Sequence, residues 1–137
     1  MLLVDTNLMV PLFVPSQISG KCIDLFRRDG DWHLPDWWLI EFANVMRTLH
    51  RADRIDDTEA EKALAAATRL FPPENTHPVD LVATLRLACE RNISAYDARF
   101  IALARSFRLK LVTEDTRLRK ACPGDTLSLD EALANPA

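Results

Sequence analysis

Two short apolar runs, each followed at once by a polar turn that carries an acid, constrain the fold of this chain most strongly. Leu2-Leu3-Val4 ends abruptly at Asp5. The run from Leu109 to Val112 leads into Thr113-Glu114-Asp115. Such runs are typical of buried strands in a parallel sheet, and a polar turn directly after them is typical of a helix start. Both ends of the chain therefore predict a strand that leads into a helix.

Between these runs the pattern is mostly helical. Periodicity and capping residues predict helices over residues 16–28, 35–54, 57–70, 80–91 and 94–107. Phe71-Pro72-Pro73-Glu74-Asn75 is a clear break, because neither proline can continue a helix. Residues 32–34 are expected as a short strand or a loop, residues 76–79 as a brief strand, and residues 127–137 are left unassigned.

This order of elements predicts the fold class. Strands and helices that alternate through short connections indicate a three-layer α/β/α sandwich with a central, mainly parallel sheet. The 137 residues, 48% of them hydrophobic and 27% charged, suit one domain with its own core. We therefore expect residues 1–137 to form a single domain.

Composition also excludes several classes of protein. No window approaches the roughly 18 apolar residues of a membrane span, and the apolar start lacks the basic flank of a signal peptide, so we expect no membrane contact and a cytoplasmic location. The cysteines are odd in number and far apart, which favours reduced thiols over disulfides: Cys22, Cys89 and Cys122. The histidines lack the close spacing of a zinc site: His33, His50 and His77.

Acids at the ends of the predicted strands are the first candidate site residues. Ligands of open parallel sheets gather at the carboxyl ends of the strands, where Asp5 and Asp115 lie. The alternative is that each acid only stabilises the first turn of the following helix. The net charge of −3 is weak evidence against a nucleic-acid partner, because four carboxylates in one pocket would account for more than all of it.

Glu41 is unusual because it interrupts a helix that is apolar on most sides, Trp37-Trp38-Leu39-Ile40-Glu41-Phe42-Ala43-Asn44-Val45-Met46. At about 100° per residue, Asn44 and Thr48 share its face and form a polar stripe. That stripe either faces solvent or lines a pocket. The few, short polar residues on it favour a pocket.

Asp97 follows Ser94 by three residues, which also fits a capping box, although such boxes favour Glu or Gln over Asp at this position. Together the four acids predict one acidic pocket, formed by Asp5, Glu41, Asp97 and Asp115. Carboxylates held close together repel one another unless cations neutralise them. Hard oxygen ligands without a nearby Cys or His pair favour Mg²⁺ or Mn²⁺ over Zn²⁺.

Four segments of the chain together resemble the PIN domain, and within it the VapC-like toxins of bacterial toxin-antitoxin modules. They are LLVDTN, PDWWLIEFANVMR, SAYDARFIALA and LKLVTEDTRL, in that order along nearly the whole chain. The resemblance implies an endoribonuclease that depends on Mg²⁺ or Mn²⁺, with Asp5 and Asp97 as its main metal ligands. It also implies RNA as substrate, a cognate antitoxin protein as partner, and a homodimer.

The resemblance further implies supporting residues that orient the acids or the attacking water. These match small polar positions of the family: Thr6, Asn7, Ser94 and Thr113. The family's acid normally comes two residues after the Thr, so Asp115 is assigned to the site and Glu114 is expected on the solvent side of the helix start. Arginines on or beside these segments are candidates for RNA contacts, among them Arg99 and Arg105.

Other α/β folds with a strand-end Asp fit less well. A haloacid-dehalogenase-like phosphatase needs a second Asp where this chain has Asn7, and the Lys of a receiver domain is not evident. The serious alternative is a PIN-like module that binds RNA or protein with little or no catalysis. It predicts no metal-dependent cleavage of RNA.

Overall fold

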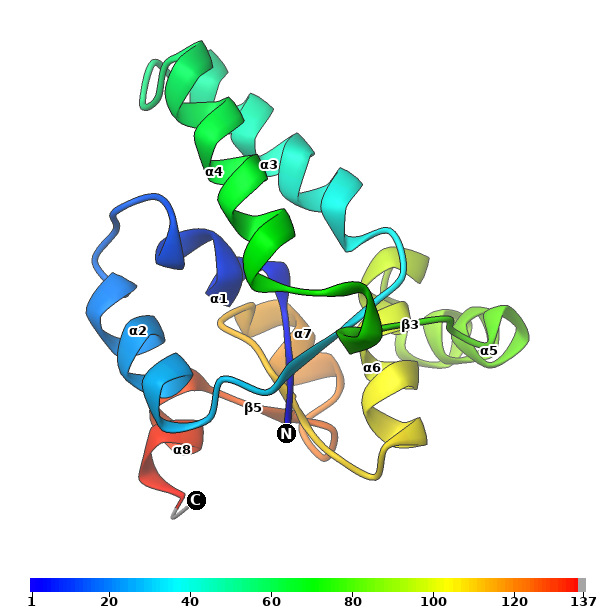
Figure 1. Cartoon of the computed structure of the whole chain (residues 1–137). Coiled ribbons are helices and arrows are strands. Elements are labelled where there is room, and N and C mark those ends of the chain that lie inside the picture. The colour runs from blue at the N-terminus through cyan, green and yellow to red at the C-terminus, as the bar shows by residue number, and fades with distance from the viewer. Residues whose placement is uncertain (136–137) are drawn as a thin grey trace.

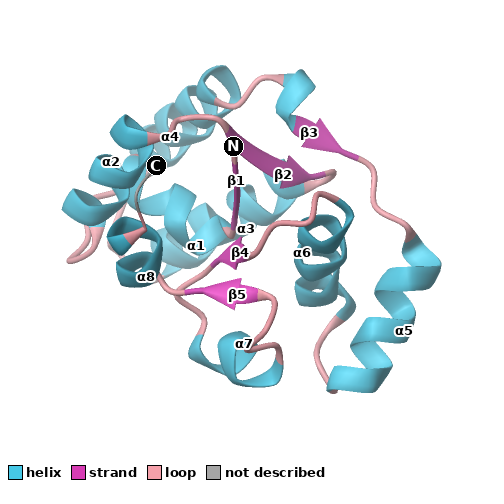
Figure 2. Cartoon of the chain, turned by 90° about the horizontal axis from the view of Figure 1, so that it is seen from below, coloured by secondary structure: helices cyan, strands magenta, loops and turns pink. Residues whose placement is uncertain are grey.

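A sheet of five parallel strands, in the order β3-β2-β1-β4-β5, forms the centre of the computed structural model, which describes residues 1–135 (Figures 1 and 2). The strands are β1 (Leu2–Val4), β2 (Trp32–Pro35), β3 (Thr76–His77), β4 (Leu111–Val112) and β5 (Thr126–Leu127). The predicted runs near the two ends of the chain pair directly, because Leu3 aligns with Leu111 and Val4 with Val112. The carboxyl ends of β1 and β4 therefore lie side by side.

Helices cover both faces of this sheet, as Figure 2 shows. They are α1 (Thr6–Met9), α2 (Ser19–Arg28), α3 (Trp38–Arg51), α4 (Asp57–Leu70), α5 (Leu81–Arg91), α6 (Ala95–Ser106), α7 (Thr116–Ala121) and α8 (Leu129–Ala134). Two 3₁₀ turns accompany them, η1 (Val10–Leu12) and η2 (Pro73–Asn75). Helices α3 and α4 pack as a hairpin that projects from the body of the molecule (Figure 1).

The two faces of the sheet have separate hydrophobic cores. Side chains alternate along a strand, so Val4 and Val112 point into a core shared with helices α1 to α4 and α8. Leu3 and Leu111 point into the other core, shared with α5, α6 and α7. The predicted three-layer α/β/α sandwich is confirmed.

The predicted elements are present, with shifts at their ends. Helix α4 matches the predicted range 57–70, and the range 32–34 is a strand that extends to Pro35. The unassigned range 127–137 contains the end of β5 and α8, and its last two residues lie outside the described residues. No helix in residues 1–135 is both long and apolar enough to cross a membrane. The single-domain organisation and the cytoplasmic location stay predictions.

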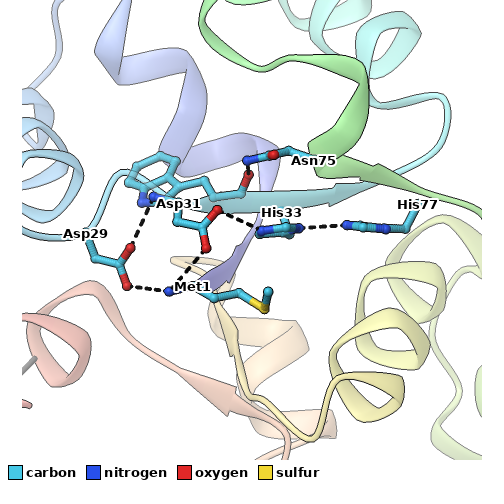
Figure 3. Close-up of polar contacts among 7 residues, drawn as sticks. Met1, Asp29, Asp31, His33, Asn75 and His77 are labelled. Carbon is cyan, nitrogen blue, oxygen red and sulfur yellow. Dashed lines mark hydrogen bonds and ion pairs between the residues drawn. The ribbon is translucent and has the colours of Figure 1, made fainter.

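Two histidines join the edge strand β3 to its neighbour β2, as Figure 3 shows. His33 Nδ1 lies 2.7 Å from His77 Nε2, and His33 Nε2 lies 2.9 Å from a carboxylate oxygen of Asp31. A carboxylate can only accept, so a neutral His33 donates from Nε2 and its Nδ1 accepts from His77. Burial, followed by the charge of His33, lowers the pKa of His77. The histidines thus form a hydrogen-bonded chain that the spacing in the sequence did not indicate.

Candidate active site

Asp5 lies at the junction of β1 and α1, with its side chain buried between the strand ends. Its residue is 7% exposed, and its backbone N–H donates to the carbonyl of Val112 at 3.0 Å. Thr113 Oγ1 donates to Asp5 Oδ2 at 2.7 Å, and Asn7 Nδ2 approaches the same oxygen at 3.2 Å. The carboxylate is therefore held by neutral donors and by no cation of the described chain.

This environment changes the acidity of Asp5. Burial raises its pKa from 3.8 to about 6, although the hydrogen bond from Thr113 opposes the rise. The negative charges of Glu41 and Asp97 raise the pKa further. Since these charges act on Asp5 from α3 and α6, three of the four predicted acids share one electrostatic environment at the carboxyl edge of the sheet.

Glu41 lies in the first turn of α3 and forms an ion pair with Arg99 of α6. Arg99 Nη2 lies 2.5 Å from Glu41 Oε2, and the two side chains are 12% and 29% exposed. Burial raises the pKa of Glu41, whereas the charge of Arg99 lowers it and the charge of Asp97 raises it. The polar stripe on α3 therefore begins at the acidic group, and Asn44 and Thr48 continue it toward solvent.

Asp97 is half-buried in the first turn of α6. Ser94 caps this helix by accepting from the Asp97 backbone N–H at 3.0 Å, but no capping box forms. The two boxes in residues 1–135 have Glu at the third helical position, at the starts of α4 and α8. Burial raises the pKa of Asp97, and the charge of Asp115 adds to this rise. The Asp97 carboxylate therefore does not complete a capping box, although its interaction with Ser94 opposes the rise in pKa.

Asp115 is the N-cap of α7, where its Oδ1 accepts from the backbone N–H groups of Arg117 and Leu118 at 2.9 and 3.0 Å. Asp115 therefore does cap α7, as the alternative interpretation predicted. Its negative charge also raises the pKa of Asp97, so it belongs to the same electrostatic environment. Among residues 1–135, no three His, Cys, Asp or Glu side chains gather closely enough to enclose a cation as they stand. The four acids are neighbours and not a closed cage.

Three of the predicted supporting residues, Thr6, Asn7 and Thr113, lie beside Asp5 at the two strand ends. Asn7 bridges them, because its Nδ2 lies 3.3 Å from Thr113 Oγ1 and its Oδ1 accepts from the backbone of Glu114 at 3.3 Å. The hydroxyl of Thr6 is buried and makes no hydrogen bond of normal length within the described chain, but it lies close enough to Glu41 to lower the pKa of that carboxyl. Ser94 and Asn44 lie farther out, as the cap of α6 and on the exposed face of α3.

One predicted position needs correction, and two arginines have acidic partners that the sequence did not reveal. Glu114 does not face solvent: it is half-buried, and its Oε1 accepts from the Leu129 backbone N–H at the start of α8, at 2.7 Å. Arg99 is bound to Glu41, and Arg105 is bound to Asp125 through two nitrogens at 2.9 and 2.7 Å, so each already has an acidic partner, and their contacts with RNA stay a prediction. Arginine positions in the sequence do not indicate which of them meets an acid on another element.

Comparison with known proteins identifies the family. A family model described as the PIN domain matches residues 2–122, a range that includes all four acids. The chain belongs to the PIN domain family. The resemblance of its four segments to that family is therefore confirmed.

Relatives of this PIN domain include named ribonucleases. It is 27% identical to "Ribonuclease VapC3" of Pyrobaculum aerophilum over 124 residues, which cover 89% of this chain and 95% of the relative. It is 34% identical to "Ribonuclease VapC9" of Mycobacterium tuberculosis over 86 residues, 63% of this chain and 66% of that protein.

Solved structures show the same fold. A crystal structure of a Pyrobaculum aerophilum protein superposes with a TM-score of 0.72 at 24% identity, covering 97% of this PIN domain and 89% of that chain. A toxin-antitoxin complex from Klebsiella pneumoniae gives a TM-score of 0.64 at 20% identity, with 94% and 98% covered. At these identities the likeness concerns the fold.

The ion pair between Glu41 and Arg99 is the main feature of the site that the sequence did not reveal. Arg99 follows Asp97 by two residues and lies 58 positions from Glu41. Its other nitrogen, Nη1, donates to the carbonyl of Asp36 at 2.7 Å, so one side chain fastens α6 to the beginning of α3. The sequence indicated this ion pair only indirectly, through the unexplained acid Glu41 in an apolar helix of this PIN domain.

Proposed function

We propose that this PIN domain is an endoribonuclease that depends on Mg²⁺ or Mn²⁺ and acts as the toxin of a toxin-antitoxin pair. The observation that carries the proposal is the group of Asp5, Glu41 and Asp97 at the carboxyl edge of the sheet, with Asp115 beside Asp97. The names of the relatives, VapC ribonucleases, supply the reaction class.

The side chains at this edge have the chemistry that a divalent cation needs, although no three of them in residues 1–135 are close enough to enclose one as they stand. Their side chains present carboxylate oxygens, the ligands that Mg²⁺ and Mn²⁺ prefer. Their raised pKa values reflect burial and mutual repulsion, which a cation would relieve. Asp5 and Asp97 would hold the ion, with Glu41 and Asp115 around it. When bound, such a cation stabilises charge that develops on a phosphoryl oxygen.

The chain's own residues then have distinct tasks. Thr113 and Asn7 fix the Asp5 carboxylate through neutral hydrogen bonds, so its charge stays available. Arg99 orients Glu41 and offsets one of the four negative charges. Burial makes Glu41 and Asp97 more basic than free carboxylates, which suits either of them to accept a proton from water. RNA binding would use exposed cations such as Arg117 and Lys120 on α7, the helix that Asp115 caps, and Arg47 and Arg51 farther along α3.

Partners are part of the same proposal. Helix α5 exposes three large apolar side chains, Leu81, Val82 and Leu85. An exposed apolar patch of this kind is typical of a protein interface and supports a homodimer or contact with a cognate antitoxin. A cytoplasmic location completes the proposal.

Cleavage of RNA by three variants tests the function. We expect Asp5→Asn and Asp97→Asn to reduce Mn²⁺-dependent cleavage of single-stranded RNA by about a hundredfold or more, because each removes a ligand worth several kcal/mol. Asp24→Asn, on the exposed face of α2, is the matched control and should cleave normally. Wild-type protein that binds RNA but does not cleave it with either metal would favour the binding-module alternative.

A further inference from the structure

An open cavity of about 480 Å³ adjoins the acidic group, between the start of α3 and the start of α6. It is lined by Trp37, Ile40, Glu41, Asn44, Tyr96 and Arg99. Two of these residues, Glu41 and Arg99, form the ion pair of the candidate active site. The cavity therefore shares Glu41 with the acidic group, and its volume lies in the range of small-ligand sites.

Trp37 is held in an exposed position at considerable conformational cost. Its φ of 71° is in the left-handed region, which is uncommon for a bulky residue. The adjacent carbonyl of Asp36 accepts a hydrogen bond from Arg99, which fixes this turn. As a result Trp37 is 78% exposed, whereas the next residue, Trp38, is 3% exposed in the core. The turn presents one indole ring to the cavity and buries the other.

Tyr96 presents a second ring from α6. It is 72% exposed and immediately precedes Asp97. Between the two rings, the cavity offers the Asn44 amide and the charged pair of Glu41 and Arg99. Aromatic faces combined with amide, guanidinium and carboxylate groups are the means by which proteins stack and hydrogen-bond unpaired nucleobases.

We propose that this cavity is a nucleobase subsite for single-stranded RNA, in which Trp37 and Tyr96 stack on a base beside the bond that is cleaved. The proposal rests on the proposed ribonuclease function and assigns the subsite that positions its substrate. Trp37 and Tyr96 are positioning residues in this scheme. The acids next to the cavity would then meet the phosphate that follows the stacked base.

A protein partner is the competing occupant. The exposed side chains of α5 continue from Trp37 and Tyr96 through a second cavity of about 300 Å³, which Leu81 and Pro78 help to line. The cores of protein interfaces are depleted in charged residues, whereas the larger cavity holds a carboxylate and a guanidinium. Trp, Tyr and Arg are common at protein interfaces, and Arg99 also lines the smaller cavity, so the preference for a base in the larger cavity rests on Glu41 and Asn44.

The test measures RNA binding without cleavage. The probe is a fluorescent single-stranded RNA of about ten nucleotides, at fixed salt and in EDTA, and binding is followed by anisotropy. Because stacking contributes about 1–3 kcal/mol per base, we expect Trp37→Ala to weaken binding roughly 5- to 150-fold. Trp37→Phe keeps an aromatic face and should stay within about threefold of wild type.

Two further variants separate stacking from folding and from α5. Trp37→Asn suits the left-handed turn better than Trp, so it should match or exceed the wild-type melting temperature while losing RNA affinity like Trp37→Ala. Leu85→Ala, an exposed apolar residue outside the cavity, should bind RNA like wild type. In every variant, the stabilisation produced by Mn²⁺ should be unchanged, because the acids are intact.

The outcomes are distinct. Unchanged RNA affinity in Trp37→Ala would overturn the subsite. If that affinity is unchanged and sedimentation also shows that the variant converts a dimer to a monomer, the Trp37 ring belongs to a protein interface. Loss of affinity in both Trp37→Ala and Trp37→Asn, with recovery in Trp37→Phe, supports it. If wild type binds RNA through Trp37 but fails to cleave it with Mn²⁺, the proposed catalysis falls while the base subsite stands.

Discussion

Replacing Asp5 with Asn should stabilise the metal-free protein in a manner that depends on pH. Burial raises the pKa of Asp5 from 3.8 to about 6. At a pH above both pKa values Asp5 is ionised in the native and in the unfolded state, and its charge is less well solvated in the native state. One pKa unit corresponds to about 1.4 kcal/mol, so the ionised Asp5 costs about 3 kcal/mol of folding free energy. Asn carries no charge and can still accept the hydrogen bond from Thr113.

The pH window follows from the sign of the shift. As pH rises from about 4 to 6, the unfolded chain releases the Asp5 proton before the native state does, so wild-type stability falls across this range. Asp5→Asn should therefore gain up to about 3 kcal/mol at pH 8, or about 10 °C in melting temperature for a chain of this size, and almost nothing at pH 3.

Urea unfolding in EDTA, followed by tryptophan fluorescence at pH 4 and pH 8, measures this gain. Asp24→Asn on the exposed face of α2 is the matched control and should change stability little at either pH. A difference between Asp5→Asn and wild type that is equal at both pH values would refute the reasoning. An Asp5→Asn variant that is less stable than wild type at pH 8 would also refute it, because the ionised Asp5 would then stabilise the native state.

Three other residues give further predictions. Arg99→Met leaves the partly buried Glu41 without its cation, and should cost about 1–2 kcal/mol in urea unfolding at pH 7 and less at pH 4, where Glu41 takes up a proton. His77→Gln removes a histidine whose pKa is lowered, so the wild-type loss of stability as pH falls below about 6.5 should be smaller in the variant, measured as melting temperature from pH 7.5 to 5.5. Asp115→Asn preserves a good N-cap, so stability should stay within about 0.5 kcal/mol of wild type while Mn²⁺-dependent cleavage falls; a large loss of stability would show that the charge serves the helix.

The sequence predicted those features of the fold and the site that leave a pattern within one segment of the chain. Leu2-Leu3-Val4 reads as a central strand because it is buried on both faces, and Asp5 reads as a site residue because it follows that strand directly. Glu41 was also recognised, since an acid in an apolar helix needs a special environment. In each case a single segment carries the signal.

The features that were missed depend on contacts between distant segments. The pair of Arg99 with Glu41 joins α6 to α3, and Glu114 reaches the start of α8 fifteen residues later. Strand β5 is two residues long, too short to show any periodicity. The orientations of Trp37 and Trp38 are set by one left-handed residue, and no composition rule predicts a left-handed Trp.

The way the acids are held links the stability of this molecule to its proposed chemistry. Glu41 has a guanidinium partner, but Asp5 is bound by a hydroxyl and an amide, which position the carboxylate without neutralising it. A cost of about 3 kcal/mol at one residue is large beside the 5–15 kcal/mol that holds a typical domain folded. A cation that binds only the native state would offset that cost in proportion to its affinity. Asp5 therefore connects folding and metal binding in one measurement: if Mn²⁺ stabilises wild type at pH 8 but not Asp5→Asn, the buried charge is the source of both effects.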